Sequence, residues 1–206
     1  MTNYIQFPRY CLYLIPNENF THDFNVFCKE NSINSSSLNE SIYGFHSTVK
    51  APFYLSHLYT EDSLIKKFQN IDSQIIHSLL SNTYFVNKIE YFKKLLVLKL
   101  DQNNNFDFVT SSLMRDFDIF RKTLNSSEIK KDIKRFDQLS DKEKIYFQIW
   151  GYPYYFECSF HHVTLPIYQK EKRDYLNSIR EIKYEKISLL KQNSPSENFK
   201  EIASLS

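Results

Sequence analysis

Two histidines in this chain are each followed, two positions later, by a threonine and then by an apolar residue. The first pair is His46 and Thr48, and the second pair is His162 and Thr164. Residues two apart on a β-strand lie on the same face, about 6 to 7 Å from each other, so each imidazole would have a hydroxyl beside it. The spacing therefore predicts two equivalent strands, each presenting one histidine and one threonine together.

These side chains suit acid–base chemistry at a phosphodiester. If the two strands face each other across a cleft, one neutral histidine can take a proton from an attacking water or hydroxyl, while the opposite, protonated histidine donates to the leaving oxygen. The threonine hydroxyls can hold the non-bridging oxygens. Such a reaction needs no metal ion and no cofactor. Because the two motifs are near equivalents, the sequence leaves open which histidine is the acid and which is the base.

A structural interpretation of the same residues also stays open. His46 and His162 could be hydrogen-bonded histidines on half-buried strands, because such short motifs give false matches. His161 stands directly before His162, so on a strand its side chain would point to the opposite face, with apolar neighbours. That position favours a structural or surface role for His161 over a catalytic one.

Other polar residues near the motifs are candidates for substrate binding. With regular alternation, Lys50 falls on the same strand face as His46 and Thr48, where it could contact a phosphate or simply add solubility. Tyr43 and Tyr154 flank the two motifs and could stack on a base or a ribose. Most of the 15 tyrosines nevertheless belong to the core or its rim.

Hydrophobic periodicity indicates the elements that must position these residues. Short apolar runs bounded by turn residues predict strands, and apolar residues at spacings of three and four predict helices. The predicted strands cover residues 9–15, 43–55, 84–91, 94–101, 154–165, 186–192 and 199–205, and the predicted helices cover residues 17–30, 61–80, 106–150 and 171–182.

The order of these elements is similar in the two halves of the chain. Each half runs motif strand, helix, strand, strand, although sequence identity between the halves is low. A two-lobed α+β architecture within a single domain of residues 1–206 follows. The first lobe would cover about residues 1–101, a helical spacer about 102–150, and the second lobe about 151–206.

The composition excludes several classes of function. Only Gly44 and Gly151 occur among the 206 residues, so neither a glycine-rich phosphate loop nor a dinucleotide-binding glycine fingerprint can be built. The formal net charge of +2 is too small for a broad nucleic-acid or membrane surface, although a local basic pocket stays open. With 42% hydrophobic and 17% aromatic residues, the chain is expected to fold around a sizeable core.

The three cysteines and the N-terminal region indicate a compartment. Cys11, Cys28 and Cys158 share no paired spacing, which argues against both a disulfide framework and a zinc cluster, so we expect reduced, mostly buried thiols. The N-terminal region lacks a basic flank with an apolar core, and the apolar run from Cys11 to Ile15 is too short to span a membrane. These features predict a cytoplasmic protein with no membrane association.

Longer stretches around the motifs carry a resemblance to a known family. Residues 43–53 read YGFHSTVKAPF, and residues 150–154 read WGYPY shortly before the second motif. The paired motifs resemble those of the two-histidine (2H) phosphoesterase superfamily, which includes cyclic phosphodiesterases and RNA 2′,5′-ligase-like proteins. The longer stretches are similar to its branch associated with bacterial phosphonate-utilisation genes, over nearly the whole chain.

The resemblance implies a fold and a set of catalytic residues. The implied fold is bilobal and α+β, with two antiparallel sheets facing across a central cleft and helices outside. The implied catalytic residues are His46 and His162 with Thr48 and Thr164. Lys50 occupies the place of the lysine that follows the first motif in that branch, which implies substrate binding.

Arg121 matches an arginine in the helical spacer of the same branch, so the resemblance implies that it too binds substrate. Three positions depart from the pattern. His161 replaces an aromatic residue, Lys122 stands where a proline is usual, and Pro166 follows the second motif. These departures concern the detail of the pocket more than the class of reaction.

We therefore expect a metal-independent phosphodiesterase or cyclic-phosphate hydrolase that acts, as a monomer, on a small ribose-containing phosphoester or cyclic nucleotide. One alternative is a protein that binds a cyclic nucleotide or an RNA end without turnover. A second alternative is RNA 2′,5′-ligase-like processing of short RNA, which would need a wider basic surface than a net charge of +2 indicates.

Overall fold

The computed structural model describes residues 7–30, 45–92, 95–123, 140–142, 144–145, 161–165 and 179–206. Four helices and eight strands are defined within these ranges. In chain order they are β1 (Arg9–Pro16), α1 (Glu18–Glu30), β2 (His46–Tyr54), α3 (Glu61–Gln69), α4 (Ser73–Leu80), β3 (Tyr84–Phe92), β4 (Leu95–Leu100), α5 (Asn104–Asp118), β5 (His162–Leu165), β6 (Glu181–Ile182), β7 (Tyr184–Gln192) and β8 (Lys200–Leu205).

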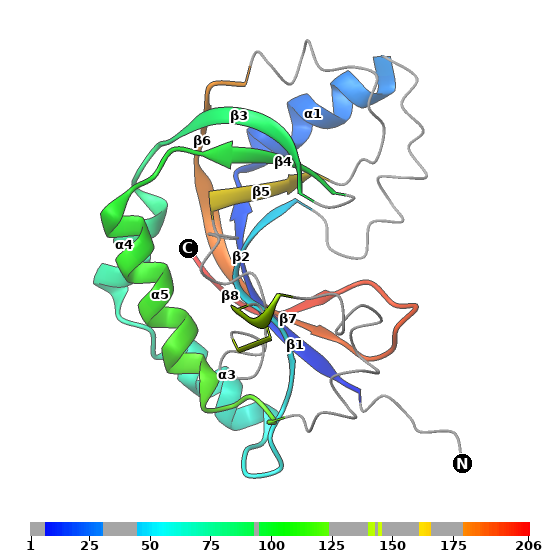
Figure 1. Ribbon diagram of the computed structural model, residues 1–206, viewed down its shortest axis with the longest axis vertical. Helices are drawn as coiled ribbons and strands as arrows, with labels where there is room; N and C mark the ends of the chain where they lie inside the picture. Colours follow the sequence, from blue (N-terminus) through cyan, green and yellow to red (C-terminus); the bar gives the residue numbers. More distant parts are fainter. Residues whose placement is uncertain are drawn as a thin grey trace.

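The eight strands form one antiparallel sheet in the order β6-β3-β4-β5-β2-β1-β7-β8. Figure 1 shows that this sheet is strongly curled, with β3 and β4 at one end and β7 and β8 at the other. The predicted α+β class is confirmed. The two separate sheets implied by the resemblance are replaced here by a single sheet, because the motif strands β2 and β5 pair directly with each other and join its two halves.

Each half of the sheet takes strands from distant parts of the chain. Strands β2, β1, β7 and β8 follow one another on one side of the centre, while β5, β4, β3 and β6 follow one another on the other. The motif strands β2 and β5 are therefore the two central strands, although about 110 residues separate them along the chain. The division into lobes of residues 1–101 and 151–206 stays a prediction, and neither half of the sheet is built from one of those ranges alone.

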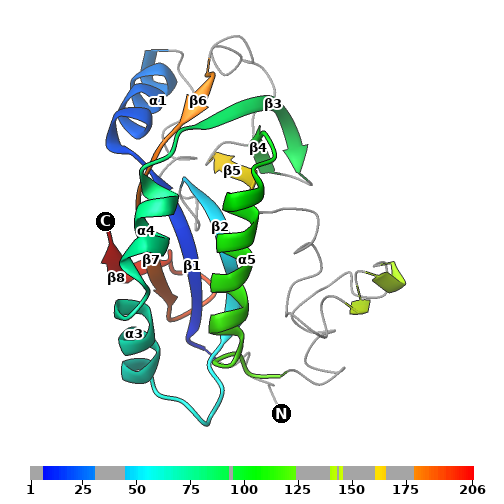
Figure 2. The ribbon, with the colours of Figure 1, turned by 90° about the vertical axis from the view of Figure 1, so that its left-hand side faces the viewer.

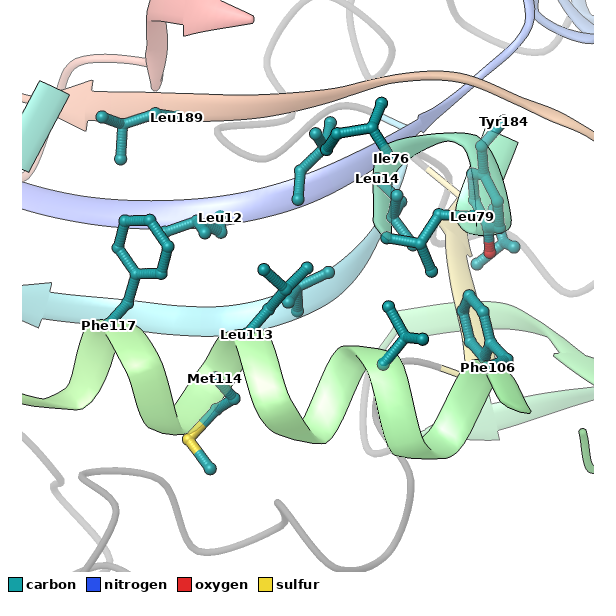
Figure 3. Packing of buried hydrophobic residues seen from close by; sticks show 14 of the residues in the cluster. Leu12, Leu14, Ile76, Leu79, Phe106, Leu113, Met114, Phe117, Tyr184 and Leu189 are labelled. Carbon is teal, nitrogen blue, oxygen red and sulfur yellow. The ribbon is translucent and has the colours of Figure 1, made fainter. Parts of the chain in front are cut away.

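Helices α3, α4 and α5 cover one face of the sheet (Figures 1 and 2). Figure 3 shows Leu113 and Phe117 of α5 and Leu79 of α4 packed against Leu12 and Leu14 of β1. All five side chains are buried. Burial of side chains of this size stabilises the fold by about 1.5 to 3 kcal/mol each, so this helix-covered face holds the main core.

The helix predicted over residues 61–80 is instead two helices, α3 and α4. Asn70 caps the end of α3. The Asp72 side chain accepts a hydrogen bond from the backbone N–H of Gln74 and so caps the start of α4. The apolar spacing is continuous across this break, which is why periodicity alone predicted one helix. The polar residues of the sequence Asn-Ile-Asp are the local signal for the break.

Two other helix predictions are corrected. The long helical block predicted over residues 106–150 is interrupted: α5 ends at Asp118, residues 119–123 are not helical, and residues 141, 142, 144 and 145 are helical again. The helix predicted over residues 171–182 is wrong at its end, because Glu181 and Ile182 form β6 and pair with Phe85 and Tyr84 of β3. Its first part, residues 171–178, lies outside the described residues, as do the predicted loop at 31–39 and residues 154–160 of a predicted strand. Across the described ranges, no helix is both long enough and apolar enough to cross a bilayer.

Candidate active site

The two His-x-Thr motifs meet on neighbouring strands in the middle of the sheet. In the antiparallel pairing of β2 and β5, His46 lies directly across from Thr164, and Ser47 lies across from Val163. Extending this register by one residue sets Thr48 opposite His162. The prediction that the two strands face each other across a cleft was wrong, since they lie side by side in one sheet. The register nevertheless makes His46 and His162 diagonal neighbours on the two strands.

The motif side chains lie on the face of the sheet opposite α3, α4 and α5, which we call the motif face. Val163 and Leu165 of β5 belong to the helix-covered core, so by strand alternation His162 and Thr164 point to the other side. Because His46 lies across from Thr164, His46 and His162 are diagonal neighbours. Diagonal residues of an antiparallel pair are about 7 to 8 Å apart, compared with about 4.5 to 5.5 Å between the Cβ atoms of directly opposite residues. The diagonal spacing suits two groups that act on either side of one phosphate.

Both histidines are buried in the fold. His46 is 4% exposed, His162 is 6% exposed and Thr164 is 8% exposed, whereas Thr48 is half-buried. The Tyr13 ring from β1 stacks on the His46 imidazole, with ring centroids 3.9 Å apart and planes 13° apart. Tyr13 alternates with the core residues Leu12 and Leu14, which confirms that it lies on the motif face.

Charged residues of the β3–β4 hairpin surround His162. Lys99 of β4 lies directly across from His162, and Glu90 of β3 lies one strand further along. The Glu90 Oε1 atom is 3.3 Å from His162 Nε2 and 3.9 Å from Lys99 Nζ. The other carboxylate oxygen, Oε2, is 2.6 Å from Lys88 Nζ. One carboxylate thus faces three cationic or titratable groups.

This environment moves two pKa values. Burial lowers the pKa of His162 below its ordinary value and Lys99 adds to that effect, while Glu90 acts in the opposite direction. The hydrogen bond from Lys88 holds the pKa of Glu90 below its usual range. At neutral pH, Glu90 is therefore ionised and His162 is neutral in the protein without substrate.

Lys50 lies on the helix-covered face and not beside His46 and Thr48. Tyr13 pairs with Thr48 but Leu12 pairs with Lys50, so β2 carries a bulge at Val49 that ends the regular alternation. The Lys50 ammonium bonds to Asp118 of α5 and lies 3.6 Å from the Met114 sulfur. Burial lowers the pKa of Lys50 to about 8, against the opposing charge of Asp118.

Arg121 shares the same carboxylate as Lys50. Its Nε and Nη2 atoms donate to the two oxygens of Asp118 at 2.8 and 3.1 Å. Burial raises the pKa of Asp118, but the hydrogen bonds from Arg121 and Lys50 and their charges outweigh it and lower that pKa. The structure thus brings Lys50 and Arg121 together beneath the sheet, away from the two motif histidines. Their contact with substrate stays a prediction.

His161 points to the helix-covered face, as its position before His162 predicted. Its Nε2 atom bonds to the Asp107 carboxylate of α5, and its ring packs edge-on against Phe106 at 5.5 Å. It is 2% exposed. The predicted orientation of His161 is confirmed, and its contacts join β5 to α5. The two tyrosines predicted to bind substrate, Tyr43 and Tyr154, lie outside the described residues.

The neighbours of the two histidines in the sheet come from strands that carry no His-x-Thr motif. Tyr13, Lys88, Glu90 and Lys99 were not predicted as site residues. The spacing of Lys88 and Glu90, two apart in a predicted strand, places them on one face. Their position beside His162, however, depends on the order of β3, β4 and β5, which no local pattern encodes.

The described residues define an α+β protein with a histidine-centred candidate site on one face of a curled antiparallel sheet. The chain belongs to the family described as "Protein of unknown function (DUF1045)", whose model matches residues 48–200. That range contains Thr48, His162 and Thr164 and begins two residues after His46.

A named relative matches part of the chain. The chain is 29% identical over 126 residues to a ribose 1,5-bisphosphate phosphokinase PhnN from Janthinobacterium sp. (strain Marseille). The match covers 60% of this chain and 26% of that protein, so the chain spans about a quarter of the relative's length.

Proposed function

We propose that this protein is a metal-independent phosphodiesterase or cyclic-phosphate hydrolase of the two-histidine type. The observation that carries the proposal is the pairing of His46 with Thr164 on adjacent strands, which brings both motifs to one face of the sheet. Two imidazoles and two hydroxyls are then presented together on one face of two neighbouring strands. The one-sheet architecture differs from the implied pair of sheets, but it keeps this convergence.

The reaction is hydrolysis of one ester bond to phosphorus. Neutral His162 takes a proton from a water molecule as the water oxygen bonds to phosphorus, and protonated His46 donates its proton to the leaving oxygen as the phosphorus–oxygen bond breaks. Thr48 and Thr164 donate hydrogen bonds to the non-bridging oxygens. The products are a phosphomonoester and a free hydroxyl, and exchange with solvent restores the two histidines.

The environment of His162 supports its role as the base. Burial lowers its pKa, which keeps it neutral at the pH of most cells. The adjacent Glu90 carboxylate stabilises the imidazolium that forms when His162 accepts a proton. His46 has a different neighbour, the stacked ring of Tyr13. The two motifs, equivalent in sequence, therefore have unequal surroundings, which supports unequal roles.

The proposed substrate is a small phosphoester that contains ribose, such as a cyclic ribose phosphate or a cyclic nucleotide. The matched relative is named for a ribose phosphate, ribose 1,5-bisphosphate, which supports the ribose in this proposal. The resemblance to the branch associated with phosphonate-utilisation genes supports the same class of substrate. We propose that the protein acts on it as a monomer in the cytoplasm, without a cofactor.

The test is a substrate screen followed by substitution of each motif. Purified protein is incubated with 2′,3′-cyclic nucleotides, cyclic ribose phosphates, cyclic dinucleotides and short 2′,5′-linked RNA, and ³¹P NMR follows the products. We expect a phosphomonoester from a cyclic ribose phosphate or nucleotide. His46→Ala and His162→Ala should each lower turnover by on the order of 10²-fold or more, because each removes one proton-transfer partner.

The matched control is His77→Ala. His77 is exposed on α4, on the helix-covered side of the sheet, and should be dispensable for turnover. Binding of these compounds without any product would contradict the proposal and favour a binding protein. Turnover that survives both motif substitutions would also contradict it.

A further inference from the structure

Glu90 occupies an unusual position for a charged strand residue. It is 28% exposed, and its two carboxylate oxygens face different partners. Oε2 is bound by Lys88 on its own strand at 2.6 Å, whereas Oε1 is turned toward the buried His162 Nε2 at 3.3 Å. The carboxylate thus links an exposed lysine to a buried imidazole.

An ordinary surface ion pair does not account for this arrangement. Exposed lysine–carboxylate pairs contribute little to stability and do not need a particular oxygen geometry. The Lys88 side chain is 53% exposed and Lys99 is 40% exposed, but His162 is 7% exposed at its side chain. A carboxylate beside a buried histidine restricts the rotation of the ring and selects which nitrogen carries the proton.

We infer that Glu90 is a positioning residue for His162: with Oε1 3.3 Å from Nε2, its carboxylate favours the proton on that nitrogen, restrains the ring and leaves Nδ1 as the basic nitrogen. Lys88 holds the Glu90 carboxylate in place through the other oxygen. Lys99, directly across from His162, opposes the charge of Glu90. The catalytic consequence rests on the proposed function, whereas the effect on the ring of His162 does not.

Three titratable or charged groups share the motif face with His162 in addition to Lys88: Glu90 from β3, Lys99 from β4 and His46 from β2. His161, which precedes His162 in the chain, points to the helix-covered face. Glu90 raises the pKa of His162, whereas Lys99 and His161 lower it. Removing Glu90 and removing Lys99 must therefore move the proton affinity of His162 in opposite directions.

The experiment is an NMR titration of the His162 ring nitrogens in the full chain. Glu90→Gln is expected to lower the pKa of His162, and Lys99→Met is expected to raise it. The ring ¹⁵N shifts of the wild-type protein should show Nε2 protonated and Nδ1 unprotonated in the neutral form. His162→Gln identifies the resonances, since it removes one imidazole only.

Glu201→Gln is the matched control. Glu201 is also a strand carboxylate held by a lysine, with Lys186 Nζ at 2.8 Å, but it lies on β8 at the far edge of the sheet. This variant should leave the His162 titration unchanged. A His162 titration that is the same in wild-type and Glu90→Gln protein would overturn the inference, as would a neutral form with Nδ1 protonated.

Kinetics then separate this inference from the proposed function. Glu90→Gln should lower kcat by roughly tenfold or more with KM little changed. The reason is that it weakens His162 as the general base, and one proton-transfer group contributes about 10²- to 10⁴-fold to a reaction rate. Glu90→Asp, which keeps the charge, should recover part of that loss. If the titration shifts as expected but no phosphoester is hydrolysed, the positioning role stands and the proposed function fails. If hydrolysis depends on His162 but Glu90→Gln leaves the His162 titration unchanged, the positioning role fails and the proposed function stands.

Discussion

The Ser47 hydroxyl donates a hydrogen bond to the backbone carbonyl of His162, 3.2 Å away. The middle residue of the first motif is therefore bonded to the histidine of the second. The same hydroxyl lies 2.5 Å from the hydroxyl of Tyr184, which burial gives a raised pKa. Beneath the two histidines, the motif strands are thus joined by a buried polar group as well as by the backbone.

Ser47→Ala should lower the free energy of unfolding by about 1 to 3 kcal/mol. The substitution leaves the Tyr184 hydroxyl without its Ser47 partner and removes a bond to the His162 carbonyl, both in the interior. Urea denaturation measures the change. Ser196→Ala, at an exposed turn position, is the control and should stay within about 0.5 kcal/mol of wild type. Equal stability of the two variants would show that the buried bond contributes nothing.

Lys50 should make stability rise with pH in the alkaline range. Its folded-state pKa of about 8 lies below the ordinary 10.5, so between these values the unfolded chain binds a proton that the folded chain does not. The free energy of unfolding should therefore rise by up to about 3 kcal/mol between pH 8 and 10.5, relative to Lys50→Met.

The comparison with Lys50→Met isolates this effect. Tyr10, Tyr84 and Tyr184 have raised pKa values, which act in the opposite direction at higher pH, but they are present in both proteins. Urea denaturation at pH 8 and pH 10 measures the difference. Identical pH slopes for wild type and Lys50→Met would mean that Lys50 is not buried as a titrating group.

Turnover should follow a bell-shaped pH profile. The mechanism needs one histidine neutral and the other protonated, so activity falls when both are charged and when both are neutral. Because burial lowers the pKa of His162, the acid limb of kcat/KM should lie below about pH 6.5. The apparent pKa values of the two limbs belong to the coupled pair of histidines and not to either residue alone. A profile that is flat from about pH 5 to 9, with chemistry rate-limiting, would rule out histidine as the group that controls the step.

Chelation should leave activity intact. The proposed step uses two imidazoles and two hydroxyls, so Mg²⁺, Mn²⁺ or Zn²⁺ should not be required. The measurement is turnover after exhaustive dialysis against EDTA, compared with the same sample after each metal is added back. Activity that disappears on dialysis and returns with one metal would replace the two-histidine mechanism with a metal-assisted one.

His161→Phe should separate stability from chemistry. His161 is buried against Phe106 and bonded to Asp107, so its replacement should lower Tm. It should leave the pH profile of turnover with both limbs, because His161 points away from the motif face. Differential scanning calorimetry and the pH profile are measured on the same preparation. Loss of one limb of the pH profile in this variant would mean that His161, and not His162, is the catalytic histidine of the second motif.

Strands and their alternation were predictable where the signal is local. The sequence placed β1, β4, β7 and β8 within about two residues of their ends, because each is a short apolar run bounded by turn residues. It also placed the His161 side chain on the correct face. These features depend on residues close together in the chain.

What could not be predicted depends on pairing between distant segments. The bulge at Val49 that turns Lys50 toward α5 appears only in the register between β1 and β2. Glu90 lies near His162 only because β3, β4 and β5 are consecutive strands in the sheet. A single sequence contains no local signal for either arrangement, so a regular strand was the better expectation for Lys50.

Strand β1 cannot be paired on both sides until residue 192 has left the ribosome. Its partner β7 lies at the other end of the chain, and the side chains of Arg9 and Gln192, which bond across the pair, are 183 residues apart. Pairing of such distant segments is entropically costly and slow. The nascent chain must hold an apolar strand with an unsatisfied edge throughout synthesis of the middle of the protein. Folding in the cell should therefore depend on protection of that edge from aggregation until the last strands arrive.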